Sequence, residues 1–104
     1  MKSISTKELK EMLDNNSNIQ VIDVRTNEEW QEFRIDSDKV INIDVNQLIS
    51  NLQKIDANKE IYVICASGGR SGMAQLMLSA KGIEAINVAG GMYDWISNGF
   101  QTIS

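Results

Sequence analysis

The side chain best suited to chemistry in this sequence is Cys65, the only cysteine among 104 residues. Four small residues follow it, and then come Arg70 and Ser71. A loop of small residues can turn its backbone N–H groups inward and bind an anion, helped by the dipole of a following helix. Such a loop, with Arg70 nearby, should hold the pKa of the Cys65 thiol below its usual value. The pattern therefore predicts an activated cysteine nucleophile.

The loop residues expected to surround the sulfur are Ala66, Ser67, Gly68, Gly69 and Ser71. An alternative is that Cys65 is a small buried residue at a strand end, which is the commonest place for a free cysteine. A purely structural turn seldom needs two adjacent glycines with a cation at the end. We therefore favour the nucleophile, with Arg70 as the second catalytic residue.

The sequence contains no histidine, which limits the possible mechanisms. Ser-His-Asp and Cys-His catalysis both need an imidazole as the general base, so both are excluded. The usual cysteine and histidine zinc sets are excluded as well, and no metal is expected. A reactive Cys65 would have to depend on its loop and on Arg70.

Short β-branched segments alternate with helical patterns along the whole chain, which predicts an α/β fold. The expected strands are 19–24, 40–43, 60–65 and 85–88. Their nearly continuous apolar runs are typical of parallel strands covered on both faces. Cys65 ends the most apolar of these strands, and functional groups in such sheets gather beyond the carboxyl ends of the strands.

Two helices are expected to begin after capping boxes at Ser5 and Thr26. Three more are expected over about 45–54, 71–81 and 92–97. Together these elements predict one domain over residues 1–104. Its architecture should be a three-layer α/β sandwich, with a central and mostly parallel sheet of about five strands flanked by helices. The Gly90-Gly91 pair should form a tight turn from strand to helix.

The composition is that of an ordinary folded domain, with 42% hydrophobic and 23% charged residues. A net charge of −4 and the lack of any basic run argue against nucleic acid as a partner. No apolar stretch approaches the ~20 residues of a membrane span, and charged residues interrupt the N-terminus before a signal peptide could form. We therefore expect a cytoplasmic protein without a membrane or nucleic-acid partner.

Three segments resemble one known family. The segment CASGGRS at 65–71 resembles the active-site loop of rhodanese-like domains. The segment VIDVR at 21–25, followed by Glu28-Glu29-Trp30, resembles the N-terminal signature of that family, and GGMYDW at 90–95 resembles its C-terminal one. The resemblance implies a sulfurtransferase that moves a sulfane sulfur through a persulfide on Cys65.

The resemblance also implies the partners and the supporting residues. The donor would be thiosulfate or a persulfide, the acceptor a thiol or cyanide, and a partner protein could carry the persulfide. No metal or organic cofactor is required. Asp23 and Arg25 would brace the active loop, although a cap at the strand end is equally compatible, and we take both residues as structural. The segment from Phe33 to Lys39 departs from the family pattern, since it is longer and lacks proline.

Two competing functions remain open at the level of the sequence. Phosphatases and arsenate reductases also place a cysteine at the base of an anion-binding loop that ends in arginine. Here four residues separate Cys65 from Arg70, one fewer than is usual in those enzymes, which suits a single sulfur better than a tetrahedral oxyanion. The other alternative is a non-catalytic binding module with the same fold, against which the intact cysteine loop argues.

Overall fold

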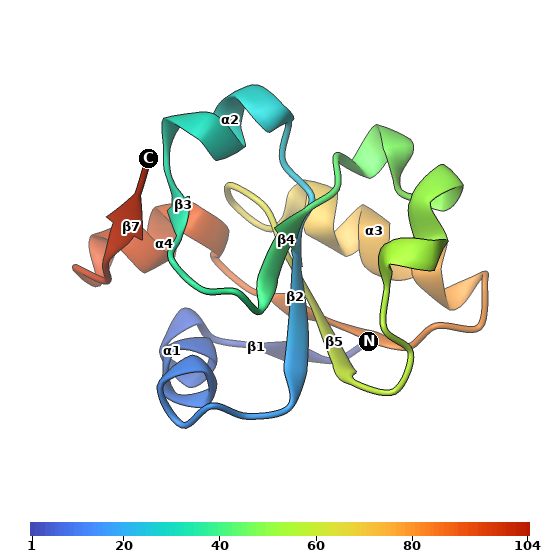
Figure 1. The fold of residues 1–104 in the computed structure, drawn as a ribbon, viewed down its shortest axis with the longest axis horizontal. Coiled ribbons are helices and arrows are strands. Elements are labelled where there is room, and N and C mark those ends of the chain that lie inside the picture. Colours follow the sequence, from blue (N-terminus) through green and yellow to red (C-terminus); the bar gives the residue numbers. More distant parts are fainter.

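A five-stranded parallel sheet forms the centre of the computed structural model, which describes residues 1–104 (Figure 1). Its strands lie in the order β1-β6-β5-β2-β4. Their bounds are β1 Ser3–Ile4, β2 Ile19–Asp23, β4 Val40–Asn42, β5 Glu60–Ile64 and β6 Ala85–Val88. Four strands lie where the sequence predicts them. The fifth, β1, is too short to produce a recognisable pattern.

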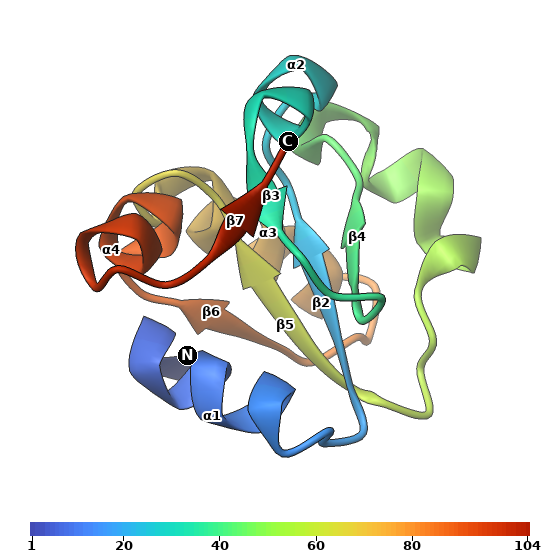
Figure 2. The same cartoon turned by 60° about the vertical axis from the view of Figure 1, so that its left-hand side comes forward.

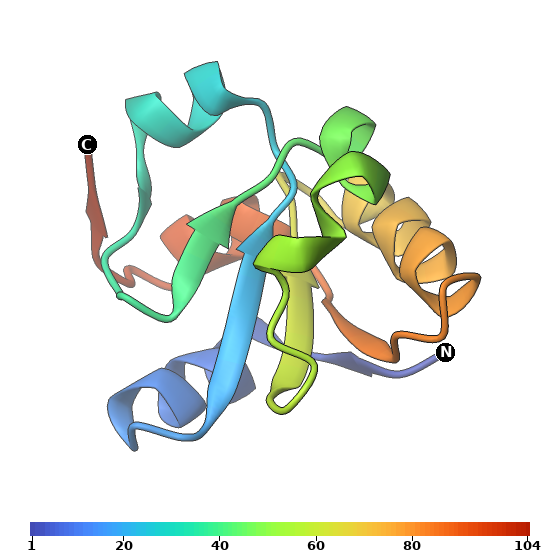
Figure 3. The same cartoon turned by 45° about the vertical axis from the view of Figure 1, so that its right-hand side comes forward.

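Helices cover both faces of this sheet, which confirms the predicted sandwich (Figure 3). One face carries α1 Thr6–Asp14 and α4 Gly91–Ser97, and the other carries α3 Gly69–Ser79 with the 3-10 helices η1 Val45–Gln47 and η2 Ile49–Lys54. The short helix α2 Asn27–Glu32 follows β2. None of the helices has the length and apolar character that crossing a membrane requires.

Neighbouring residues of a central strand belong to different hydrophobic cores. In β5, Val63 packs with Leu78 of α3, whereas Tyr62 and Ile64 lie in the core that contains Trp95 of α4. Successive strand residues point to opposite faces of a sheet, so a strand covered on both sides must be apolar throughout. This explains the continuous apolar runs from which the parallel sheet was predicted.

The two predicted capping boxes are both present. The Ser5 side chain accepts a hydrogen bond from the Glu8 N–H at 3.1 Å, and the Ser5 N–H donates to the Glu8 carboxylate. Thr26 and Glu29 make the equivalent pair at the start of α2. Each box pairs backbone N–H groups that the helix leaves free, so these helix starts follow from local sequence.

The helix predicted over 45–54 is instead two 3-10 helices, η1 and η2, with a kink at Asn51. The Asp44 side chain accepts from the Asn46 N–H at 2.9 Å, and the Asn51 side chain donates to the Gln47 carbonyl at 2.7 Å. Short polar side chains that bond nearby backbone groups compete with regular helical hydrogen bonds. The helix predicted over 71–81 is present as α3, but it begins and ends two residues earlier, at Gly69 and Ser79.

Part of the segment from Phe33 to Lys39, which departs from the family pattern, lies in a small second sheet. Within it, β3 Arg34–Ile35 pairs antiparallel with β7 Thr102–Ile103, next to the C-terminus (Figure 2). Ile35 is buried in the same core as Trp95. A strand of two residues is too short to show an alternating hydrophobic pattern, and these two strands are far apart in the sequence. The sequence therefore did not predict this sheet.

Candidate active site

Cys65 lies directly after β5, at the carboxyl end of the middle strand of the sheet. It is a free cysteine and is only 1% exposed, so its sulfur lies beneath the loop rather than on the surface. The loop passes through Ser67 and enters α3 at Gly69. The predicted strand, loop and helix arrangement is therefore present, with the cysteine at its base.

The sulfur of Cys65 has two polar neighbours from its own loop. The Gly68 N–H donates to Sγ at 3.0 Å, and the Ser71 hydroxyl lies 3.3 Å from Sγ. Gly68 adopts a φ of +117°, which only glycine adopts readily, and this turn brings its N–H to face the sulfur. At Gly69, by contrast, an added Cβ would meet no atom within 4 Å. Only the first glycine of the pair is required by the backbone.

These contacts set the acidity of the cysteine. Burial alone would raise the pKa of the Cys65 thiol, but hydrogen bonds from the Ser71 side chain and from loop N–H groups outweigh burial. The resulting pKa lies below the usual value for cysteine. Hydrogen bonds to the charged form stabilise the thiolate. Arg70, to which the sequence assigned part of this effect, is not among its main causes.

Ser71→Ala should weaken the thiolate. Losing a hydrogen bond to the charged form raises the pKa of Cys65, so alkylation by iodoacetamide near pH 7 should slow by roughly tenfold. The measurement is the alkylation rate against pH. Ser67→Ala is the matched control, because Ser67 is exposed in the same loop and its side chain makes no hydrogen bond. Equal rates in the two variants would show that the Ser71 hydroxyl does not act on the sulfur.

Helix α4 holds the loop from the other side. The Met92 N–H donates to the Cys65 carbonyl at 2.8 Å, and the Tyr93 N–H donates to the Ala66 carbonyl at 3.0 Å. Gly91, which precedes them, is buried with a φ of +59°. A Cβ at Gly91 would lie 2.4 Å from the Cys65 carbonyl oxygen. The predicted tight turn therefore brings the start of α4 directly against the backbone of the cysteine loop.

Arg70 makes no hydrogen bond to the sulfur and instead forms a two-pronged ion pair with Glu29 of α2. Its Nη1 and Nη2 atoms lie 2.6 and 3.0 Å from the two carboxylate oxygens. The Arg70 hydrogen bonds are the main reason that the pKa of Glu29 falls to about 2. The sequence indicated Glu29 as the capping partner of Thr26 and as part of the family signature, but not as a partner of Arg70. Nothing local predicts a contact between residues that lie 41 positions apart.

Asp23 and Arg25 form a buried ion pair at 2.8 Å, with each side chain 1% exposed. Arg25 also donates to the Phe33 carbonyl at 2.8 Å, so the pair joins the end of β2 to the end of α2. Neither side chain hydrogen bonds to the cysteine loop. Asn42, which the sequence did not single out, donates to the carbonyls of Asp23 and Arg25 at 2.9 Å each. These contacts fit the structural role expected for Asp23 and Arg25.

A small hollow of about 180 Å³ lies beside the loop. Its lining is Arg25, Glu29, Glu32, Phe33, Ala66, Met92 and Tyr93. The lining combines apolar side chains with two carboxylates, and its single cation, Arg25, is already paired with Asp23. No group of three or more His, Cys, Asp or Glu side chains is placed to hold a metal ion.

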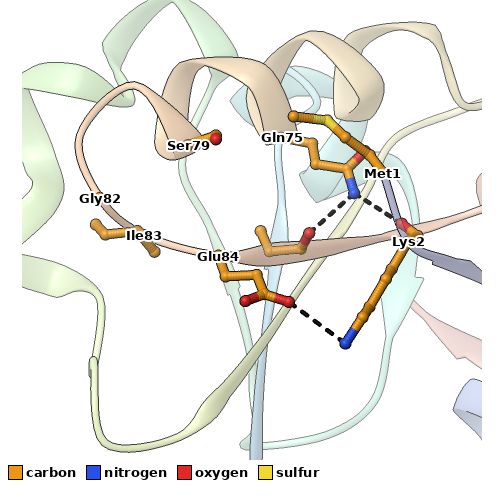
Figure 4. Close-up of a pocket in the computed structure, with 8 residues that line it drawn as sticks. Met1, Lys2, Gln75, Ser79, Gly82, Ile83 and Glu84 are labelled. Atoms are coloured by element: carbon orange, nitrogen blue, oxygen red, sulfur yellow. Dashed lines mark hydrogen bonds and ion pairs between the residues drawn. The ribbon is translucent and has the colours of Figure 1, made fainter.

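The largest hollow, of about 420 Å³, is elsewhere and is lined in part by Lys2, Gln75 and Glu84 (Figure 4). It lies by the start of β6 and therefore at the edge of the parallel sheet opposite Cys65. Three of its polar side chains are already paired. Lys2 forms an ion pair with Glu84 at 3.4 Å, and the Gln75 amide donates to the carbonyls of Lys2 and Ala85.

Comparison with known proteins agrees with this geometry. The family model described as "Rhodanese-like domain" matches residues 5–98. The chain is 35% identical over 95 residues to "Putative sulfurtransferase YtwF" of Bacillus subtilis, with 91% of this chain and 90% of that protein covered. A crystal structure of a rhodanese-like domain protein from Staphylococcus aureus has a TM-score of 0.87 and 38% identity, with 100% of both chains covered.

A second relative is longer than this chain. "Putative sulfur carrier protein YrkF" of Bacillus subtilis is 34% identical over 93 residues, which are 88% of this chain. The chain spans about half the length of that relative, since the match covers 49% of it.

Proposed function

Because this chain belongs to the rhodanese-like domain family, we propose that it is a sulfurtransferase that carries a sulfane sulfur as a persulfide on Cys65. The observation that carries this proposal is the Gly68 N–H aimed at Sγ at 3.0 Å, with the Ser71 hydroxyl at 3.3 Å. Burial alone would also suit a structural cysteine. A sulfur in a purely apolar site, however, has no hydrogen-bond donors arranged around it, and donors stabilise an anion.

In the first step the Cys65 thiolate attacks the outer sulfur of the donor. A sulfur–sulfur bond forms to Cys65 as the sulfur–sulfur bond of the donor breaks. The donor leaves with the electron pair of that bond, as a thiolate from a persulfide or as sulfite from thiosulfate. Cys65 now carries one additional sulfur, and charge is balanced without an oxidant or a reductant.

In the second step the acceptor attacks the outer sulfur of the persulfide. Cyanide leaves as thiocyanate and a thiol leaves as a persulfide, while the electron pair returns to Cys65 as a thiolate. We assign Ala66, Ser67, Gly68, Gly69 and Ser71 to the loop that holds the persulfide. Donors placed in advance where negative charge resides lower the barrier in the way that an oxyanion hole does.

Arg70 has a less direct part in this proposal than the sequence suggested. Its guanidinium is held by Glu29, so it contributes charge near the site without a hydrogen bond to Sγ. Since α3 begins at Gly69, Arg70 also lies in the first turn of that helix. We propose that it helps donor capture, and that Cys65 remains the nucleophile when it is removed.

The purified protein should transfer sulfur from thiosulfate or glutathione persulfide to cyanide or a thiol, and should not hydrolyse aryl phosphates or reduce arsenate. Four residues separate Cys65 from Arg70, and a loop of this length suits one sulfur better than a tetrahedral oxyanion. The measurement is turnover with each substrate, and protein alkylated at Cys65 provides the blank. If the protein hydrolyses phosphate esters faster than it transfers sulfur, the proposal is wrong and the protein is a phosphatase.

Absence of transfer from every donor would favour the binding module instead. That result is decisive only if the protein is folded and its cysteine is reduced, so thiol titration and circular dichroism accompany the donor panel.

A further inference from the structure

We infer that Glu29 determines the donor preference of this site, by neutralising Arg70 and so disfavouring the thiosulfate dianion relative to thiol persulfides. The inference rests on the proposed sulfurtransferase function and deepens it. It makes Glu29 a specificity-determining residue, although the side chain does not contact the sulfur.

The carboxylate of Glu29 is fully committed to its position. Arg70 occupies both oxygens, and the Thr26 N–H and hydroxyl bind Oε1 at 3.0 and 3.1 Å. Four donors on one carboxylate keep the ion pair formed over the whole range of physiological pH, since the pKa of Glu29 is about 2. The guanidinium of Arg70 is therefore held toward α2, and the Glu29 carboxylate offsets part of the positive charge that Arg70 presents to an incoming donor.

The hollow beside the loop holds no unpaired cation that could replace Arg70. Arg25 lies at the same edge of the sheet, but it is buried and paired with Asp23 at 2.8 Å. The hollow beside Ala66 contains Glu29 and Glu32, and Arg25 is its only basic residue. In the lining of this hollow the two ion pairs cancel and Glu32 remains, so the charged side chains there sum to slightly acidic.

This charge balance discriminates between the two classes of donor. Thiosulfate brings two negative charges and a sulfonate group that needs cations or free hydrogen-bond donors. A thiol persulfide brings at most one charge at the reacting sulfur, and its organic part can lie against Phe33, Ala66 and Tyr93 in the hollow. Like charges repel and unpaired anions are costly to desolvate, so the site favours the persulfide.

The test is Glu29→Gln, which removes the charge and retains an oxygen that can accept from Thr26 at the helix start. The matched control is Glu28→Gln, since Glu28 is the preceding residue of α2, is exposed and has no ion pair. For each protein, kcat/KM is measured with thiosulfate and with the persulfide of 2-mercaptoethanol, whose organic part is uncharged, at low and high ionic strength. The readout is the ratio of the two values, which a general loss of folding does not change.

In Glu29→Gln the ratio should move toward thiosulfate by about tenfold at low ionic strength, and by less at high ionic strength. Glu28→Gln should leave the ratio within about twofold. An unchanged ratio in Glu29→Gln, or an equal change in both variants, would overturn the inference. Failure of the proposed function has a different signature, since the unmodified protein would then gain no sulfur from either donor.

Discussion

The Cys65→Ser protein should gain no mass when it is incubated with a persulfide donor, whereas the unmodified protein should become heavier by one sulfur atom. A serine hydroxyl cannot form the persulfide, so sulfur transfer should fall to the uncatalysed background. The fold should persist, because the change is nearly isosteric and should cost only about 1 kcal/mol in the free energy of unfolding. Intact-protein mass spectrometry measures the loading, and circular dichroism checks the fold.

The chain has no second cysteine to resolve the persulfide, so the loaded form should last until an external acceptor arrives. Addition of cyanide or a small thiol should restore the original mass. Protein alkylated before exposure to the donor is the control for sulfur bound elsewhere. If the alkylated protein or Cys65→Ser gains as much sulfur as the unmodified protein, then Cys65 is not the carrier.

Gly91→Ala should lower the free energy of unfolding by about 3 kcal/mol or more and greatly reduce sulfur loading. Two costs combine at this position. The positive φ of +59° strains any residue with a Cβ, and that Cβ would lie 2.4 Å from the Cys65 carbonyl oxygen. Relief of the clash must move α4 away from the loop, which breaks the Met92 and Tyr93 hydrogen bonds. Urea unfolding and mass spectrometry measure the two effects.

Gly99→Ala is the matched control for backbone strain. Its φ of +75° is similar to that of Gly91, but a Cβ there would meet no atom within 4 Å. It should cost about 1 kcal/mol and leave sulfur loading intact. The difference between the two variants isolates the contact between α4 and the loop. If Gly91→Ala is no worse than Gly99→Ala in stability and loading, the start of α4 does not constrain the loop.

Local signals predicted much of the fold correctly because the physics that they report is local. The capping boxes at Ser5 and Thr26 pair backbone groups within a single turn, so the helix starts could be assigned from the sequence. The parallel sheet could be predicted because strands covered on both faces must be apolar throughout. The prediction over 45–54 was wrong in helix type, since Asp44 and Asn51 bond to neighbouring backbone instead.

The sequence by itself determined that one thiol is available, that it ends a central strand, and that a glycine-containing loop leads from it into a helix. These properties depend on residue types and on neighbours a few positions away. The tertiary structure alone decided where Arg70 points, because its partner Glu29 lies 41 residues earlier in the chain. It also decided that α4 closes the loop through the Cys65 carbonyl. Contacts between distant segments depend on how the layers pack, and a single sequence carries no local signal for them.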